Sequence, residues 1–89
     1  MAWRIEYSSE ADKVISRLDR QIAQRIIKFM GSRVAKLEDP QSIGEALAGS
    51  SLGNYWRYRV GNYRIIVDIQ DAKLCVQVVR LGNRREVYR

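Results

Sequence analysis

Three arginines lie close together near the middle of this 89-residue chain, at positions 57, 59 and 64. Large apolar and basic residues alternate around Gly61-Asn62, which is typical of a β-hairpin with a two-residue type II′ turn. In that register Arg59 is opposite Arg64, and the side chain of Arg57 points to the same face. Like charges opposite each other normally destabilise a sheet, so this cluster indicates a surface that binds a polyanion.

The other face of the same hairpin is apolar and is expected to be buried. The register pairs Val60 with Tyr63, Tyr58 with Ile65, and Arg57 with Ile66. Side chains alternate with a period of two. The residues of the apolar face are therefore Trp56, Tyr58, Val60, Tyr63, Ile65 and Val67.

The chain has no histidine and one cysteine, Cys75. This composition excludes an internal disulfide, a structural zinc site, and nucleophiles activated by histidine. Catalysis would have to use Arg, Lys, Tyr or carboxylates, and we expect no cofactor and no metal. Cys75 lies in an apolar run and is expected to be a small core residue. With a single cysteine, the reducing cytoplasm is the expected location. We expect no membrane partner, because no apolar run approaches the length of a membrane span.

Positive charge is concentrated in the second part of the chain. Residues 1–54 carry eight Lys/Arg and seven Asp/Glu, whereas residues 55–89 carry eight and three. Twelve of the 16 basic residues are arginine, which suits bidentate contacts with phosphate. Basic residues interleaved with aromatic ones indicate a nucleic-acid surface. A general role of charge in solubility is the alternative, and it explains the clustering less well.

The N-terminal half predicts one strand and two helices. Residues 3–7 alternate as a strand, Ser9 is the expected N-cap of a first helix, and Asp19 begins a second helix that ends at Asp39-Pro40. Basic residues around the second helix are interpreted as a solvated face. Its apolar stripe comprises Ile22, Ala23, Ile26, Ile27, Met30, Val34 and Leu37.

The remaining segments complete a single α+β domain spanning residues 1–89. Residues 41–54 are expected to form a loop with one helical turn at 45–47. After the hairpin, residues 71–73 form a polar turn and 74–81 a final buried strand. Three strands at the end of the chain favour an antiparallel meander with both helices on one face.

The chain closes with Gly82-Asn83-Arg84-Arg85-Glu86-Val87-Tyr88-Arg89. Together with residues 56–64, this motif resembles the RelE/ParE superfamily of bacterial toxins from type II toxin–antitoxin systems, and it is most similar to the RelE branch. The resemblance implies two N-terminal helices on a small, mainly antiparallel four-stranded sheet, in the order β-α-α-β-β-β. It also implies a metal-independent endoribonuclease that cleaves mRNA in the ribosomal A site, with the RNA 2′-OH as nucleophile.

The resemblance also implies a role for each motif residue. Arg64, Arg84 and Tyr88 correspond to the catalytic set. The RNA-binding set is Arg57, Arg59 and Arg85. Tyr88 could transfer a proton or stack on a base. The well-studied RelE nuclease has lysines at the positions of Arg57 and Arg59, and many relatives have histidine where this chain has Asn83.

The resemblance further implies the partners: an acidic RelB-like antitoxin, the ribosome and mRNA. The free toxin would be a monomer and would form a hetero-oligomer with its antitoxin. Two other functions stay open at this point. One is a ParE-like inhibitor of DNA gyrase, and the other is a catalytically inactive module that binds RNA or the antitoxin.

Overall fold

A mixed β-sheet with helices on one face forms the described part of the computed structural model, which comprises residues 2–47 and 55–85. The two α-helices precede most of the sheet, so the fold is α+β as predicted. The α-helices are α1 (Ser9–Arg17) and α2 (Arg20–Lys28), and the strands of the described ranges are β1 (Arg4–Tyr7), β2 (Glu45–Ala46), β3 (Tyr55–Val60), β4 (Tyr63–Gln70) and β5 (Cys75–Asn83).

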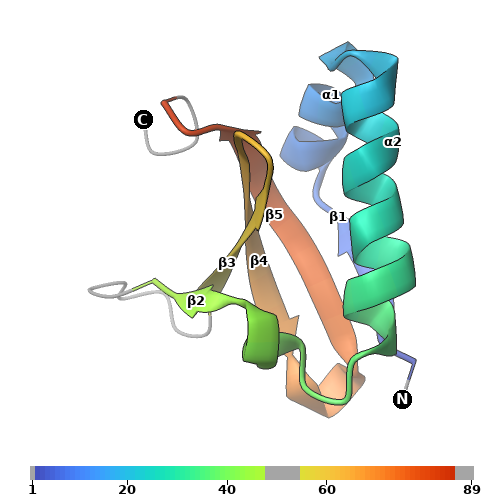
Figure 1. Ribbon diagram of the computed structural model, residues 1–89. Helices are drawn as coiled ribbons and strands as arrows, with labels where there is room; N and C mark the ends of the chain where they lie inside the picture. The colour runs from blue at the N-terminus through green and yellow to red at the C-terminus, as the bar shows by residue number, and fades with distance from the viewer. Residues whose placement is uncertain (1, 48–54, 86–89) are drawn as a thin grey trace.

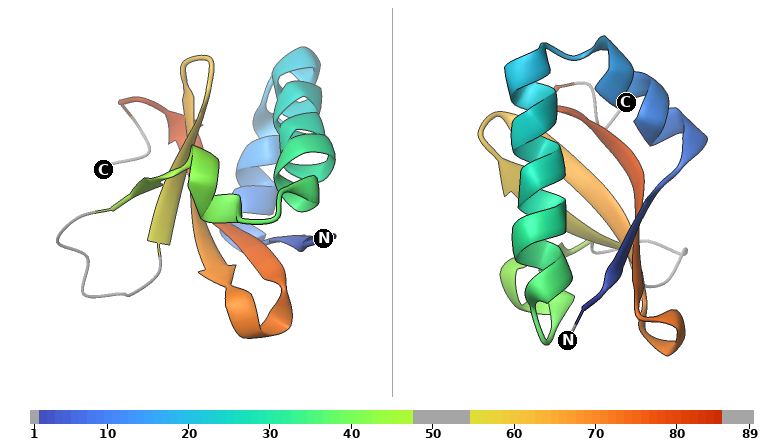
Figure 2. Two further views of the ribbon diagram at one scale, coloured as in Figure 1. Left: turned by 60° about the horizontal axis from the view of Figure 1, so that its bottom comes forward. Right: turned by 90° about the vertical axis from the view of Figure 1, so that its right-hand side faces the viewer.

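The sheet has the strand order β1-β5-β4-β3-β2. Both helices pack on one of its faces, and β2 reaches out on the opposite side (Figure 1). The two further views in Figure 2 show the same arrangement of a helix layer over a twisted sheet. The core between the layers contains Ile26, Met30 and Val34 from the helical side, facing Ile65 and Val67 of the sheet. No helix in the described ranges is long and apolar enough to cross a membrane.

The prediction of a four-stranded sheet was wrong, because the sheet has five strands. The predicted order of elements was wrong for the same reason, because the additional strand precedes β3. A fifth strand, β2, pairs with β3 antiparallel, so that Glu45 faces Arg57. The predicted helical turn at 45–47 is therefore incorrect, and the helical turn of this segment is a 3₁₀-helix at Pro40–Ile43. The sheet is mixed because β1 runs parallel to β5.

The first helix begins one residue earlier than predicted. Ser8, not Ser9, is the N-cap of α1, and its Oγ accepts a hydrogen bond from the backbone N–H of Ala11. Asp19 caps α2 as predicted, by accepting from the N–H of Gln21. The predicted apolar stripe of the second helix was wrong at Ile27, whose side chain is exposed.

The helical chain after α2 changes its hydrogen-bonding pattern. Residues Phe29–Arg33 form a π-helical turn and Val34–Lys36 a 3₁₀ turn. A π turn shifts the face that the following side chains present by part of a turn. Met30 and Val34 are both fully buried across this segment.

The hairpin has the predicted register in every pair from Tyr55–Asp68 to Val60–Tyr63. The first turn residue, Gly61, has a φ of 58°. The second, Asn62, has a negative φ, because Leu74 is the only non-glycine residue of the described ranges whose φ is positive. This combination matches the predicted type II′ turn. Cys75 is fully buried, and burial raises the pKa of its thiol, as expected for a core residue.

Two glycines are expected to respond oppositely to substitution by alanine. A Cβ at Gly31 would meet no atom within 4 Å, so Gly31→Ala should raise the free energy of unfolding by about 0.5–1 kcal/mol through lower backbone entropy of the unfolded chain. Gly61→Ala should lower it by about 1–3 kcal/mol, because the positive φ strains any other residue. Urea unfolding of both variants tests this. Equal effects would contradict the assignment of Gly61 to the turn.

Candidate functional site

Four arginines line a pocket of about 400 Å³ on the sheet face that α1 and α2 leave uncovered: Arg57, Arg59, Arg64 and Arg84. The first two belong to β3, the third to β4, and Arg84 follows directly after β5. Three neighbouring segments of the sheet therefore each contribute a guanidinium. The predicted clustering of Arg57, Arg59 and Arg64 on one face is confirmed, and Arg84, which the resemblance had grouped with Arg64, lines the same pocket.

Arg64 lies at the centre of this pocket, between two strands. It pairs with Arg59 on one side and with Gly82 on the other. The Nη1 of Arg64 donates to the carbonyls of Gly61 (3.1 Å) and Tyr63 (3.2 Å), which directs the side chain along the hairpin turn.

Backbone contacts join the end of β5 to the hairpin turn. The N–H of Arg84 donates to the carbonyl of Asn62 at 3.1 Å. Arg85 does not line the four-arginine pocket. It lines a neighbouring pocket of about 270 Å³ together with Asn62, Asn83 and Arg84. Arg84 thus lines both pockets. Tyr88, the third residue of the predicted catalytic set, lies outside the described residues.

A carboxylate that the sequence interpretation missed lies beside the arginines. Glu45 on β2 forms ion pairs with Arg57, through its Oε2, and with Arg59, whose Nη2 is 3.2 Å from its Oε1. The side chain of Arg57 is 22% exposed and that of Arg59 57%, so Arg59 is the more accessible to a ligand. Four positive charges therefore line the pocket, and one negative charge lies beside it, paired with two of them.

The arginines keep the Glu45 carboxylate ionised. The hydrogen bond from Arg57 lowers the pKa of Glu45, and the charges of Arg57, Arg59 and Arg64 add to this effect. An ionised carboxylate next to a pocket of arginines can accept a proton or hold the guanidinium groups in place.

Tyr58 cannot act as an acid or a base in the four-arginine pocket. Its hydroxyl donates a hydrogen bond to the carbonyl of Pro40, and burial raises the pKa of that hydroxyl.

The sequence does contain a signal for Glu45. It is the only Asp or Glu between Pro40 and Val67, a range that contains three of the four pocket arginines. A lone carboxylate shortly before a cluster of arginines is a candidate partner for them. The expectation of a helical turn at 45–47 obscured this, because a turn would not place Glu45 opposite Arg57.

Helices on one face and an arginine pocket on the other define a small α+β domain suited to binding phosphate groups. The match of residues 5–88 to the family model described as "ParE toxin of type II toxin-antitoxin system, parDE" shows that the chain belongs to this family, and so to the RelE/ParE superfamily of toxins. The resemblance noted in the sequence is thereby confirmed at the level of the superfamily.

Relatives support the same assignment. Toxin RelG of Mycobacterium tuberculosis is 22% identical over 89 residues, which cover 100% of this chain and 99% of that protein. The toxin–antitoxin complex RelBE2 of M. tuberculosis contains a chain with a TM-score of 0.83 and 20% identity, covering 97% of this chain and 95% of that one. The archaeal RelE–RelB complex of Pyrococcus horikoshii gives a TM-score of 0.76 at 20% identity, with coverage of 97% and 99%. The fold is thus that of RelE-like toxins.

Proposed function

We propose that this toxin is a ribosome-dependent endoribonuclease that cleaves mRNA in the A site and inhibits translation. The observation that carries the proposal is the pocket that Arg57, Arg59, Arg64 and Arg84 line, with the Glu45 carboxylate paired to two of them. This arrangement combines groups that neutralise a phosphate with one group that can accept a proton. The likeness to RelE-like toxins supports the substrate class.

The proposed reaction uses the 2′-hydroxyl of one nucleotide as the nucleophile. Its oxygen forms a bond to the adjacent phosphorus while the P–O5′ bond breaks, which yields a 2′,3′-cyclic phosphate and a 5′-hydroxyl. Negative charge gathers on the phosphoryl oxygens in the transition state, and preorganised cations stabilise it strongly. Arg64 and Arg84 take this role, whereas Arg57, Arg59 and Arg85 hold flanking phosphates.

Two protons must move in this reaction. The proton of the 2′-hydroxyl passes to the ionised Glu45 carboxylate. The departing 5′-oxygen takes a proton from Tyr88 or from water. Because the guanidinium groups are effectively always charged, arginine itself is a poor proton donor. The proposal therefore assigns proton transfer to Glu45 and Tyr88, with stacking on a base as the alternative role of Tyr88.

The ribosome is required because a strongly positive, open pocket orders a flexible RNA poorly by itself. Incubating the toxin with ribosomes that carry a defined mRNA should produce new 5′ ends inside A-site codons, detectable by primer extension. Cleavage of the same RNA at an equal rate without ribosomes would contradict the requirement.

Tyr88 is expected to be essential for cleavage and dispensable for ribosome binding. Tyr88→Phe should lose most of the cleavage, roughly 10²-fold, if the hydroxyl donates the proton. Single-turnover cleavage and ribosome co-sedimentation measure the two properties separately. Near-normal cleavage by Tyr88→Phe together with loss in Tyr88→Ala would mean that the ring stacks. Full activity after deletion of residues 88–89 would remove Tyr88 from the site.

The proposed partner is an acidic RelB-like antitoxin in the same cytoplasm, and the free toxin is proposed to be a monomer. Several of the similar solved structures are toxin–antitoxin complexes, among them the RelE–RelB complexes of Pyrococcus horikoshii and Methanococcus jannaschii, which supports this assignment. A segment that folds on binding could cover the arginine pocket. Affinity that stays unchanged between low and high salt would argue against the pocket as a major contact.

A ParE-like inhibitor of DNA gyrase is the second candidate, because the matching family model bears the ParE name. Following the synthesis of protein and DNA after induction separates the candidates. Translation stops first for an endoribonuclease of the ribosome, and DNA replication stops first for a gyrase inhibitor. A catalytically inactive module would stop neither.

A further inference from the structure

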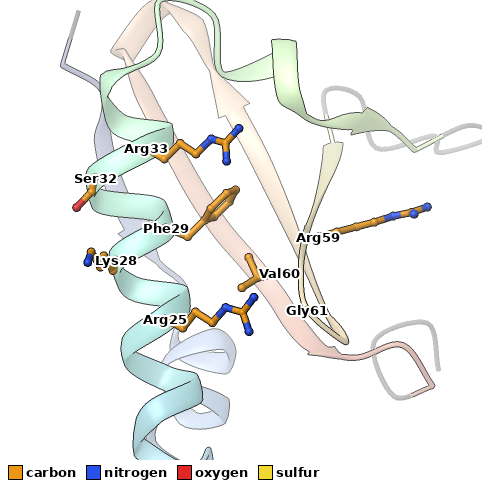
Figure 3. Close-up of a pocket in the computed structure, with 8 residues that line it drawn as sticks. All are labelled: Arg25, Lys28, Phe29, Ser32, Arg33, Arg59, Val60 and Gly61. Carbon is orange, nitrogen blue, oxygen red and sulfur yellow. The ribbon is translucent and has the colours of Figure 1, made fainter.

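A second pocket, of about 420 Å³, lies between the α2 side of the molecule and the hairpin. Figure 3 shows that Arg25 and Arg33 flank the ring of Phe29 and extend from the helix toward β3, whereas Arg59 points away from the helix. We call this pocket the helix-side cleft. The lining residues that matter here are Arg25, Lys28, Phe29, Arg33, Arg59 and Val60.

The helix-side cleft carries positive charge from Arg25, Lys28, Arg33 and Arg59. None of Arg25, Lys28 and Arg33 forms an ion pair with a described residue, and no Asp or Glu lines the cleft. In the four-arginine pocket, by contrast, Glu45 pairs with both Arg57 and Arg59. Arg25, Lys28 and Arg33 are exposed, as expected for a solvated helix face, and they also line one pocket.

Neighbouring groups hold the two helical arginines of the cleft, Arg25 and Arg33, in place. A Cβ at Gly61 would lie 3.4 Å from Nη1 of Arg25, so this guanidinium contacts the hairpin turn. The guanidinium carbon of Arg33 lies 5.9 Å from the ring centroid of Phe29, within range of a cation–π interaction. Phe29 in turn packs edge-on against Tyr58, with ring centroids 5.8 Å apart. The cations are thus partly ordered before any ligand binds, which lowers the entropic cost of binding.

The spacing of the cations favours an extended polyanion. Arg25 and Arg33 are eight residues apart in one helical segment, which corresponds to about 12 Å along the axis. Their side chains lie on either side of Phe29, so an extended anion is suited to spanning both (Figure 3). An acidic peptide would also need apolar anchoring sites, but Val60 is only 8% exposed and Phe29 is already packed against Tyr58. A phosphodiester backbone needs only the charges.

The helix-side cleft and the four-arginine pocket share one residue. Arg59 lines both, and the two pockets lie on opposite sides of β3 next to the hairpin turn. We propose that the helix-side cleft is a second binding site for an RNA backbone, in which Arg25, Lys28 and Arg33 hold phosphates remote from the cleavage site. The proposal rests on the proposed function for its ligand class, and it adds a site that contributes affinity and no chemistry.

The test measures binding of a fluorescent, single-stranded RNA of about 20 nucleotides with 2′-O-methyl groups throughout, which lacks the nucleophile and cannot be cleaved. The cleft variant carries Arg25→Gln, Lys28→Gln and Arg33→Gln. The control variant removes three exposed charges elsewhere, through Lys13→Gln, Lys36→Gln and Lys73→Gln. Circular dichroism and thermal melting verify that both variants fold.

The cleft variant should bind this RNA at least about 10-fold more weakly at low salt. Three lost phosphate contacts should also make the slope of log Kd against log salt shallower by about 2. The control should keep the slope of the unmodified toxin. On programmed ribosomes the cleft variant should raise KM and leave kcat within about twofold.

Two results would overturn the proposal. One is an unchanged salt slope in the folded cleft variant, or an equal change in the control. The other is unchanged RNA affinity combined with weaker binding of poly-glutamate, which would assign the cleft to an acidic protein segment. Absence of cleavage by the unmodified toxin would refute the proposed function, while the binding assay with uncleavable RNA would still decide this inference.

Discussion

Arg64→Ala is expected to slow mRNA cleavage on the ribosome by about 10²–10³-fold, the usual effect of removing one preorganised donor from a charged transition state. Arg64 lies between Arg59 and Gly82 in the sheet and lines the four-arginine pocket. The loss should fall on the rate of single-turnover cleavage at saturating toxin. Growth inhibition on expression should be relieved in parallel.

The same variant should remain folded. Arg64 donates two exposed or part-buried hydrogen bonds to the hairpin turn, and their loss is offset by relief of the like charge on Arg59. We therefore expect the free energy of unfolding to change by less than about 1 kcal/mol. Arg64→Lys is the matched control, since it keeps the charge but not the planar fork, and it should recover only part of the rate. A collapse of the melting temperature in Arg64→Ala would assign Arg64 to the structure instead.

Glu45→Gln is expected to change cleavage and RNA affinity in opposite directions. If Glu45 accepts the proton of the 2′-hydroxyl, its loss should slow cleavage by about 10²–10⁴-fold. Removal of its charge from Arg57 and Arg59 should at the same time strengthen binding of uncleavable RNA, because phosphate no longer competes with the carboxylate. Single-turnover kinetics and anisotropy measure the two effects.

The amide of glutamine can still accept a hydrogen bond from Arg57. A Glu45 that only positions the arginines would therefore allow near-normal cleavage in Glu45→Gln and lose it in Glu45→Ala. The pH profile adds a second criterion. The arginines hold the pKa of Glu45 below its ordinary value, so the carboxylate is ionised through neutral pH and loses its basic form only as the pH falls through that lowered pKa. A one-proton rise in single-turnover rate between pH 6 and 8 that Glu45→Gln abolishes would contradict this assignment.

The hairpin was predictable because its determinants are local. A period of two, a Gly-Asn pair and a six-residue apolar face specify strands, turn and register together, and the structure has that register in every pair. The same periodicity put Arg57, Arg59 and Arg64 on one face. The start of the second helix at Asp19 was also local, since a capping carboxylate acts within one or two residues. The predicted end at Asp39-Pro40 was wrong, because α2 ends at Lys28, the helical turns after it end at Lys36, and Asp39 caps the 3₁₀-helix Pro40–Ile43.

The errors arose where local preference was weak. Ser8 and Ser9 are both acceptable N-caps, and only the observed bond from Ala11 selects Ser8. The residues around Glu45 have no period long enough to distinguish a turn from a strand. The predicted stripe of the second helix wrongly included Ile27, which lies in α2 before the π turn at Phe29–Arg33 and is exposed, whereas Met30 and Val34 are buried as predicted.

The sequence by itself thus determined the hairpin, the helix layer and the arginine-rich face. Tertiary structure decided which other groups meet that face. A two-residue strand gains almost nothing from its own propensity, so β2 exists because β3 offers it an edge, and that pairing brings Glu45 to Arg57. Arg84 joins Arg64 because the end of β5 bonds to the turn at Asn62. These contacts join residues that are 12 to 22 positions apart in the sequence. Sheet pairing and burial act between such distant segments, so they decide where these residues meet.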